Sequence, residues 1–202
     1  MAGEEKDKKE EAEKALQAGP SIEEQSLFKA RTILISAPVD AKLAHVVNTK
    51  LLAMERADAK DPIYLFINSP GGEIHSGFAI FDMIRFISPK VYTIVTGIAA
   101  SMGSLLALAA PKERRLSFPN SKFLVHQPSV YGGLGGSASD IEIHAKDLIN
   151  TKNHIVKIYA TESGRSEEEV KKALDRDYWM TANQALEWGL ISKVIKTRAE
   201  IK

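Results

Sequence analysis

The chain has 202 residues, 44% of them hydrophobic, and its 27 Lys and Arg nearly balance its 26 Asp and Glu. A chain of this length buries roughly 70% of its unfolded surface, so it can hold a core without a metal or a disulfide. It has no cysteine, which excludes disulfides, thiolate metal sites and a cysteine nucleophile. The net charge of +1 argues against nucleic acid as a partner, and the apolar runs are shorter than the ~20 residues of a membrane helix. We therefore expect a cytoplasmic protein that binds neither nucleic acid nor membrane.

The first 20 residues differ in composition from the rest of the chain. They are rich in Lys and Glu, contain few large apolar side chains, and end at Gly19-Pro20. Such a segment cannot bury enough surface to offset the entropy lost on ordering. We expect a disordered tail over 1–20 and a single domain over 21–202.

From Ser21 onward, short apolar segments alternate with amphipathic ones, which is typical of an α/β protein. Apolar residues at helical spacing predict helices over 41–56, from Phe78 to Ile87, and through 101–110. No internal repeat is evident, which excludes a solenoid. The expected strands lie at 32–35, 63–67, 91–95, 116–118, 123–125 and 190–195.

Three pairs of residues at i, i+3 match the capping box, in which a Ser or Thr side chain and an acidic or amide side chain close the first turn of a helix. Ser139 with Glu142 predicts the start of a long helix that runs to about Thr161. The other two pairs are Ser166 with Glu169 and Thr181 with Gln184, and Gly189 ends the last of these helices.

Ser101 follows a predicted strand and precedes an apolar helix. The small residues Ala99 and Gly103 flank it at minus two and plus two, an arrangement similar to the nucleophile elbow. A serine there lies at a helix N-terminus, where free N–H groups favour developing negative charge. An ordinary N-cap is the more common role of such a serine, so both interpretations stay open at this point.

Two further segments combine polar residues with unusual local geometry. Gly71 and Gly72 follow a strand end, where they allow the backbone to point an N–H at a ligand, although an ordinary turn fits them as well. His126 ends an apolar strand and is the best candidate for a general base among the five histidines, with a structural role as the alternative.

A carboxylate that could orient His126 is Asp177, which lies in the Asp175-Arg176-Asp177 run. This run equally fits a group of salt bridges. We expect no metal, because no metal-ligand spacing appears.

Taken together, five segments in the same order resemble the proteolytic subunit of the Clp protease, the ClpP family (peptidase family S14). The resemblance covers about Leu27 to about Ile195, and agreement of several motifs in order is far more specific than any one of them. The segments are Asn68-Ser69-Pro70-Gly71-Gly72, Ala99-Ala100-Ser101-Met102-Gly103, Val125-His126-Gln127-Pro128, Asp140-Ile141-Glu142-Ile143 and Arg176-Asp177.

The resemblance implies a serine endopeptidase that needs no cofactor. Ser101 would be the nucleophile, His126 the general base and Asp177 the acid that orients the histidine. The backbone N–H groups of Gly72 and Met102 would form the oxyanion hole. The implied fold is a crotonase-like core of repeated ββα units with a protruding handle, made of a glycine-rich strand and a long helix.

The resemblance also implies partners. Heptameric rings would pair through the handles into a tetradecamer that encloses the active sites, and an AAA+ unfoldase of the ClpX, ClpA or ClpC type would feed unfolded proteins into it. Ring-to-ring contacts would use Asp175 and Arg176. The loop that pairs with substrate would contain Gly132, Gly133, Gly135 and Gly136, and the unfoldase would dock on Tyr64, Phe66 and Phe86.

Two features depart from the family pattern. A charged tail replaces the usual apolar segment before the first helix, and Gly136-Ser137-Ala138-Ser139 stands where Gly-Gln-Ala-Thr is common. These departures point to a divergent second-type subunit that works with another ClpP paralogue in a mixed complex. A catalytically idle ring subunit and an acyl-CoA enzyme of the crotonase group are the alternatives.

Overall fold

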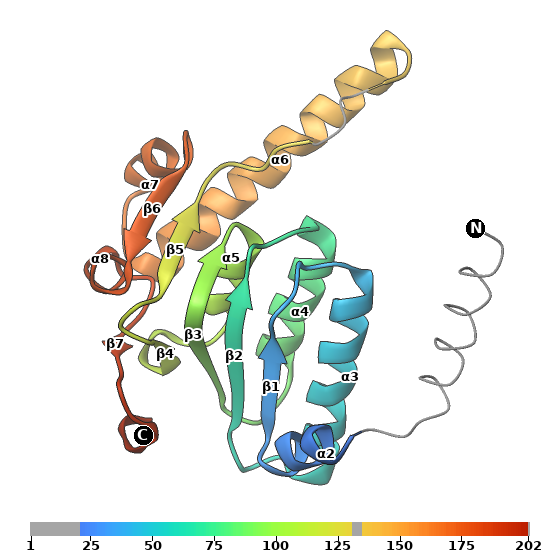
Figure 1. Ribbon diagram of the computed structural model, residues 1–202. Coiled ribbons are helices and arrows are strands. Elements are labelled where there is room, and N and C mark those ends of the chain that lie inside the picture. Colours follow the sequence, from blue (N-terminus) through green and yellow to red (C-terminus); the bar gives the residue numbers. More distant parts are fainter. Residues whose placement is uncertain (1–20, 131–134, 202) are drawn as a thin grey trace, which may run out of the picture.

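The computed structural model describes residues 21–130 and 135–201, and the expected tail together with Gly132 and Gly133 lies outside this range. Figure 1 shows a sheet flanked by helices, with one long helix extending past the body. The elements are α2 Ile22–Lys29, β1 Thr32–Ile35, α3 Ala41–Ala57, β2 Ile63–Ser69, α4 Ile74–Phe86, β3 Val91–Ala100, α5 Met102–Ala107, η1 Lys112–Arg114, β4 Arg115–Ser117, β5 Lys122–Val125, α6 Ala138–Ser163, α7 Glu167–Leu174, β6 Tyr178–Thr181, α8 Ala182–Trp188, β7 Lys193–Val194 and η2 Arg198–Glu200.

The sheet has seven strands, and all but one of its pairings are parallel. Its main order is β1-β2-β3-β4-β7, while β5 pairs with a later part of β3 and β6 runs antiparallel to β5. The strand expected at 91–95 continues to Ala100, because residues 93–95 pair with β4 and residues 98–100 pair with β5. The strand expected at 190–195 shortens to the two residues of β7. Parallel pairing brings the carboxyl ends of β1, β2 and β3 to one edge of the sheet, where ligand sites of α/β folds gather.

The main core lies between the sheet and the helices. In β2, Ile63, Leu65 and Ile67 are fully buried and join this core, while Tyr64 and Phe66 point to the opposite face. This alternation follows from the two-residue period of a strand. On the opposite face, the partly buried aromatic residues pack against a smaller cluster of Ile94, Leu116 and Ile195.

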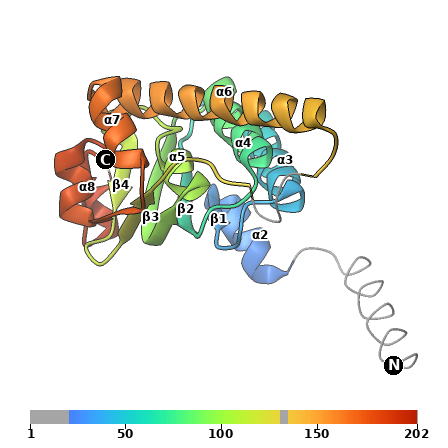
Figure 2. The same ribbon diagram turned by 90° about the horizontal axis from the view of Figure 1, so that it is seen from above.

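Helix α6 has a buried half and a projecting half. Figures 1 and 2 show its first turns extending past the body of the domain, while its last turns lie against the core. All of its buried residues come from the last third, from Ile155 to Ser163. The earlier Ile143 and Ile149 are 65% and 57% exposed. The geometry agrees with the handle helix that the family resemblance implies.

The start of α6 differs from the sequence-based prediction. Its N-cap is Ser137, whose hydroxyl accepts from the Asp140 N–H while the Asp140 carboxylate accepts from the Ser137 N–H. The predicted capping box of Ser139 and Glu142 is therefore wrong by two residues. The i, i+3 pattern of a capping box occurs at both places, and Gly136, with φ 131°, turns the chain so that the helix begins at the earlier box. The boxes at Ser166 and Thr181 are confirmed, and Gly189 ends α8 in the left-handed conformation.

In the part of the chain that the structure describes, no helix is both long and apolar enough to span a bilayer.

Candidate active site

Ser101 occupies a strained turn between β3 and α5. Its backbone has φ 53° and ψ −122°, a conformation that costs a non-glycine residue about 1–3 kcal/mol. Its N–H donates to the Leu124 carbonyl at 2.9 Å, which fixes the turn against β5. Although Ser101 is the N-cap of α5, its hydroxyl makes no capping hydrogen bond. The interpretation of Ser101 as an ordinary capping serine is therefore wrong, and strain without a capping gain points to a reactive role.

The glycine turn after β2 packs directly on this elbow. Gly71 has φ 92°, and a Cβ atom there would lie 2.5 Å from the Ala100 carbonyl oxygen and 2.7 Å from the Ser101 Cβ. The Gly71 carbonyl accepts from the Val39 N–H at 2.7 Å, which anchors the turn to the loop after β1. Glycine is thus required here by close backbone approach as well as by its dihedral angle.

Two residues line the cavity beside Ser101 with backbone N–H groups that are unpaired within the described part of the chain. Gly72 and Met102 both line it, and among the described residues neither N–H donates to a protein acceptor. Met102 is the first residue of α5, where an N–H has no partner within the helix. Such free donors beside a nucleophile are what an oxyanion hole requires.

His126 and Asp177 are brought together by the register of β5 and β6. Val125 pairs with Tyr178 in this antiparallel ladder, so the next residue of one strand faces the preceding residue of the other. The His126 Nδ1 and the Asp177 Oδ1 lie 3.3 Å apart. Asp177 is 65% exposed on its side chain and His126 is 21% exposed. With Nδ1 facing the carboxylate, Nε2 is the nitrogen left to face a nucleophile.

One cavity of about 1190 Å³ contains these groups. Its wall also carries apolar side chains, and His75 and His144 line it too. The sequence-predicted residues that line it are Ser101, His126, Asp177, Gly72, Met102 and Gly135, with Leu105, Leu124, Ile155 and Tyr159 among the apolar lining. Within the described ranges, no three His, Asp or Glu side chains gather in a way that could hold a metal ion.

Asp175 and Arg176 lie next to this cavity, in a smaller one of about 440 Å³ that Asp177 also lines. Both are exposed, and within residues 21–130 and 135–201 neither side chain forms an ion pair. Among the described residues, none of the salt bridges expected between these three side chains forms, and the contact that Asp177 makes is with the His126 ring.

Gln127 belongs to a segment of the family resemblance, but the sequence assigned it no role of its own. Its Nε2 donates to the Asp175 carbonyl at 3.0 Å, its Oε1 accepts from the Lys152 Nζ at 2.8 Å, and its N–H donates to the Leu174 carbonyl. It therefore joins the segment of His126 to α6 and to the end of α7. Only its position next to His126 could have indicated this role.

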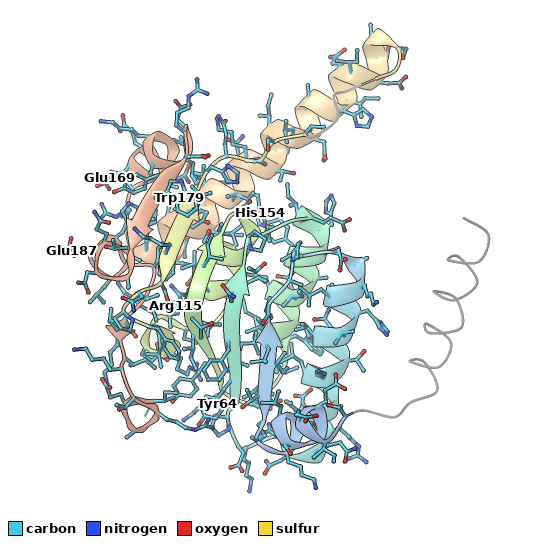
Figure 3. All side chains as sticks on the ribbon, viewed as in Figure 1. Tyr64, Arg115, His154, Glu169, Trp179 and Glu187 are labelled. Atoms are coloured by element: carbon cyan, nitrogen blue, oxygen red, sulfur yellow. The ribbon has the colours of Figure 1, made fainter. Side chains whose placement is uncertain are left out.

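The residues predicted to bind an unfoldase lie away from the cavity. Figure 3 shows Tyr64 near the beginning of β2, toward the opposite end of the sheet from His154 on α6. Tyr64 stacks on Tyr92 with ring centroids 5.5 Å apart. Phe86, the last residue of α4, is 78% exposed.

The fold and the cavity define an α/β protein that holds a serine, a histidine and an aspartate in one pocket at the carboxyl edge of its parallel strands. The family model described as Clp protease matches residues 20–198. The chain belongs to the Clp protease family, and its fold is the one that the resemblance implied.

Curated relatives support the same family. The chain is 46% identical to "ATP-dependent Clp protease proteolytic subunit 3" of Rhizobium etli, over 88% of this chain and 90% of the relative. It is 46% identical to proteolytic subunit 2 of Treponema denticola over 88% of each chain, and 45% identical to subunit 3 of Rhizobium meliloti over 96% and 98%. The numbered subunits fit a second-type ClpP paralogue, and the family supports a proteolytic, hydrolytic role.

Proposed function

We propose that this chain is a serine endopeptidase subunit in which Ser101 is the nucleophile, His126 the general base and Asp177 the orienting acid. The observation that carries the proposal is the strained Ser101 backbone, whose hydroxyl caps nothing, in one cavity with the His126 Nδ1 and the Asp177 Oδ1, which lie 3.3 Å apart. Family membership supports the peptide bond as the target.

The chemistry is acyl transfer. The Ser101 oxygen attacks the peptide carbonyl carbon, and its proton moves to Nε2 of His126, while the Asp177 carboxylate stabilises the imidazolium at Nδ1. The carbonyl oxygen becomes an oxyanion, held by the N–H groups of Gly72 and Met102. The C–N bond then breaks, and His126 returns the proton to the leaving amine. Water repeats the sequence on the acyl-enzyme, giving a carboxylic acid and free Ser101.

The apolar residues of the projecting half of α6 support an assembly. Ile141, Ile143 and Ile149 are 41%, 65% and 57% exposed in the single chain. Exposed apolar side chains gathered on one element mark surfaces that another protein covers. Copies of the chain would form heptameric rings that pair through α6 into a chamber, with Asp175 and Arg176 at the ring contact.

The unfoldase would dock at the other end of the sheet, on Tyr64, Phe66 and Phe86. The 78% exposure of Phe86 supports this, because a partner that covers so large an apolar side chain gains free energy by removing it from water. Gly135 and Gly136 would pair with substrate backbone as an added strand.

Hydrolysis of a fluorogenic peptide by wild type and by Ser101→Ala tests the enzyme assignment. We expect the variant to lose activity while native mass spectrometry finds its assembly unchanged. Robust cleavage by Ser101→Ala would contradict the proposal. An inactive wild type that still forms rings and activates a second ClpP chain would favour the idle subunit instead.

Mass measurement of the native assembly, with and without candidate unfoldases, tests the partners. We expect a double ring of fourteen chains or a mixed ring with a second paralogue, and a larger complex once ATPase and nucleotide are added. A protein that stays monomeric under all of these conditions would overturn the assembly.

A further inference from the structure

A buried chain of hydrogen bonds joins helix α6 to the backbone of Ser101. The Tyr159 hydroxyl lies 2.5 Å from the Ser104 Oγ, which in turn lies 2.7 Å from the Ser101 carbonyl oxygen. Tyr159 and Ser104 are each only 1% exposed, and no other hydrogen bond of the Tyr159 hydroxyl occurs among the described residues. A buried hydroxyl that loses its hydrogen-bond partner costs about 1–3 kcal/mol, so the Tyr159 hydroxyl depends on Ser104.

The protons of this chain have one consistent order. A carbonyl oxygen only accepts, so the single hydroxyl proton of Ser104 is donated to Ser101. Ser104 can then only accept from Tyr159, which must be the donor. Burial raises the pKa of the Tyr159 phenol well above its usual value, so this donor keeps its proton. The order is Tyr159 O–H to Ser104 O–H to the Ser101 C=O.

The end of this chain lies on the peptide unit that forms half of the expected oxyanion hole. The Ser101 carbonyl and the Met102 N–H belong to one planar unit, so fixing the direction of the carbonyl fixes the direction of the N–H. The carbonyl also accepts the N–H groups of Ser104 and Leu105 at 3.0 and 3.3 Å, so the Ser104 hydroxyl, at 2.7 Å, is a third and closer donor. Each hydrogen bond donated to the carbonyl polarises the unit and makes its N–H a stronger donor. The orientation matters most at Ser101, because its φ of 53° lies outside the conformations that L residues prefer.

We propose that Ser104 and Tyr159 are positioning residues, which act through the Ser101 carbonyl to aim and strengthen the Met102 N–H of the oxyanion hole. The inference rests on the proposed serine peptidase function. Tyr159 comes from the buried half of α6, and it also lines the cavity. The orientation of the oxyanion donor is thereby coupled to the seating of α6 on the core.

The test compares Tyr159→Phe and Ser104→Ala with a matched control, Thr93→Val. Thr93 is also 1% exposed, and its hydroxyl donates at 2.7 Å to the Ala107 carbonyl, at the other end of the same helix α5. Each variant removes a buried, hydrogen-bonded hydroxyl of this region, so each should lower the Tm. Only the first two act on the peptide unit of Ser101.

For the full assembly with a fluorogenic peptide, we expect kcat to fall about tenfold in Tyr159→Phe and by a larger factor in Ser104→Ala. Both factors should be smaller than the about 10²–10³-fold loss of kcat that follows removal of an oxyanion donor itself. KM should stay constant, and the Ki of a peptide aldehyde, which forms a tetrahedral adduct with Ser101, should rise by the factor by which kcat/KM falls. Thr93→Val should lower the Tm without changing kcat or Ki.

The double variant adds a second check. Because Tyr159 acts only through Ser104, Ser104→Ala/Tyr159→Phe should lose no more kcat than Ser104→Ala alone. Losses that multiply, a changed KM with constant kcat, or an equal kcat loss in Thr93→Val would each overturn the inference. An active wild type with an unaffected Tyr159→Phe contradicts this inference alone, whereas a wild type without Ser101-dependent cleavage contradicts the proposed function.

Discussion

The two ends of the sheet are built differently. At the carboxyl end, the turn residues Ser101, Gly71 and Gly72 have φ of 53°, 92° and 149°, and the backbone segments approach closely enough to exclude a Cβ atom. Toward the beginning of the strands, Tyr64 and Tyr92 stack in regular strand geometry on a small apolar cluster. The carboxyl end holds a group of strained turn residues and unpaired donors, whereas the other end holds an apolar surface and, among the described residues, a single non-glycine residue of positive φ, Arg31 at 52°.

Under the proposed function, the two ends of one sheet serve two tasks. At the carboxyl end, packed strands hold the strained turns in place, which is where a reactive serine could be maintained. The regular end is stabilised by packing, and under the proposed function its aromatic residues bind the unfoldase. Substitutions at the carboxyl end should therefore change catalysis, and those at the other end should change binding or stability.

The largest effect is expected for Asp177→Asn. An amide at this position stabilises the wrong tautomer of His126, so kcat should fall by about 10⁴-fold with little change in KM. Steady-state hydrolysis of a peptide measures it. Asp61→Asn, in the exposed loop before β2, is the matched control and should keep full activity. Equal turnover in wild type and Asp177→Asn would remove this residue from the catalytic set.

The next effect is expected for Gly71→Ala. The added Cβ would meet the Ala100 oxygen and the Ser101 Cβ, so the elbow must shift, and kcat/KM should fall about 10²-fold because reacting atoms tolerate little displacement. Gly164→Ala is the control, since Gly164 also has a positive φ of 78° but no atom lies within 4 Å of its Cβ position. That control should lose about 1–2 kcal/mol of stability and no activity. Similar losses of activity in both variants would show that backbone strain anywhere in the fold lowers activity, and not only strain beside Ser101.

A smaller effect is expected for Phe86→Ala. It should leave peptide hydrolysis unchanged and slow unfoldase-driven degradation of a folded protein about tenfold, since one buried aromatic anchor contributes about 1–3 kcal/mol to an interface. Leu186→Ala, an exposed apolar residue on α8, is the control. If Phe86→Ala lowers peptide hydrolysis as well, the two ends of the sheet do not act separately.

The smallest effect on activity is expected for Glu162→Gln. Burial opposes the charge of Glu162, but hydrogen bonds from Arg85 and Arg115 outweigh it and hold the pKa of this carboxyl below its usual range. The stabilisation is present above the usual pKa and is lost as the pH falls through the lowered one. We expect the variant to lose about 1–3 kcal/mol at pH 7 and the difference from wild type to shrink below about pH 4.

Denaturant unfolding over this pH range measures the stability of Glu162→Gln. Glu187→Gln is an exposed control, which should match wild type at every pH. A Glu162→Gln deficit that does not change with pH would assign the loss to packing rather than to the charge.

Local patterns predicted much of the fold. The strand over Thr32–Ile35 and the helix beginning at Ala41 follow from apolar periodicity, and the starts of α7 and α8 follow from capping boxes, which act between neighbouring residues. The extension of β3 to Ala100 was missed, because it depends on a second partner strand, β5, which is remote in sequence. The start of α6 was placed two residues late, because two overlapping patterns compete and the conformation of Gly136 favours the earlier one.

The candidate site could be predicted only in part from the sequence. Small neighbouring residues and the ends of strands, which are local features of the sequence, indicate Ser101 and Gly72. The approach of Asp177 to His126 depends on the register of β5 and β6, which the spacing of the two residues does not encode. The buried partners Ser104 and Tyr159 gave no signal either, because their meeting depends on how α6 packs on α5.

Labelling with a fluorophosphonate, followed by peptide mapping of the modified residue, tests most directly whether Ser101 is the nucleophile. The probe reacts only with a serine activated as a nucleophile. We predict one adduct per chain, on Ser101, which Ser101→Ala abolishes and Asp177→Asn slows. An unlabelled wild type with intact assembly, or an adduct on another residue, would contradict the assignment of Ser101 as the nucleophile.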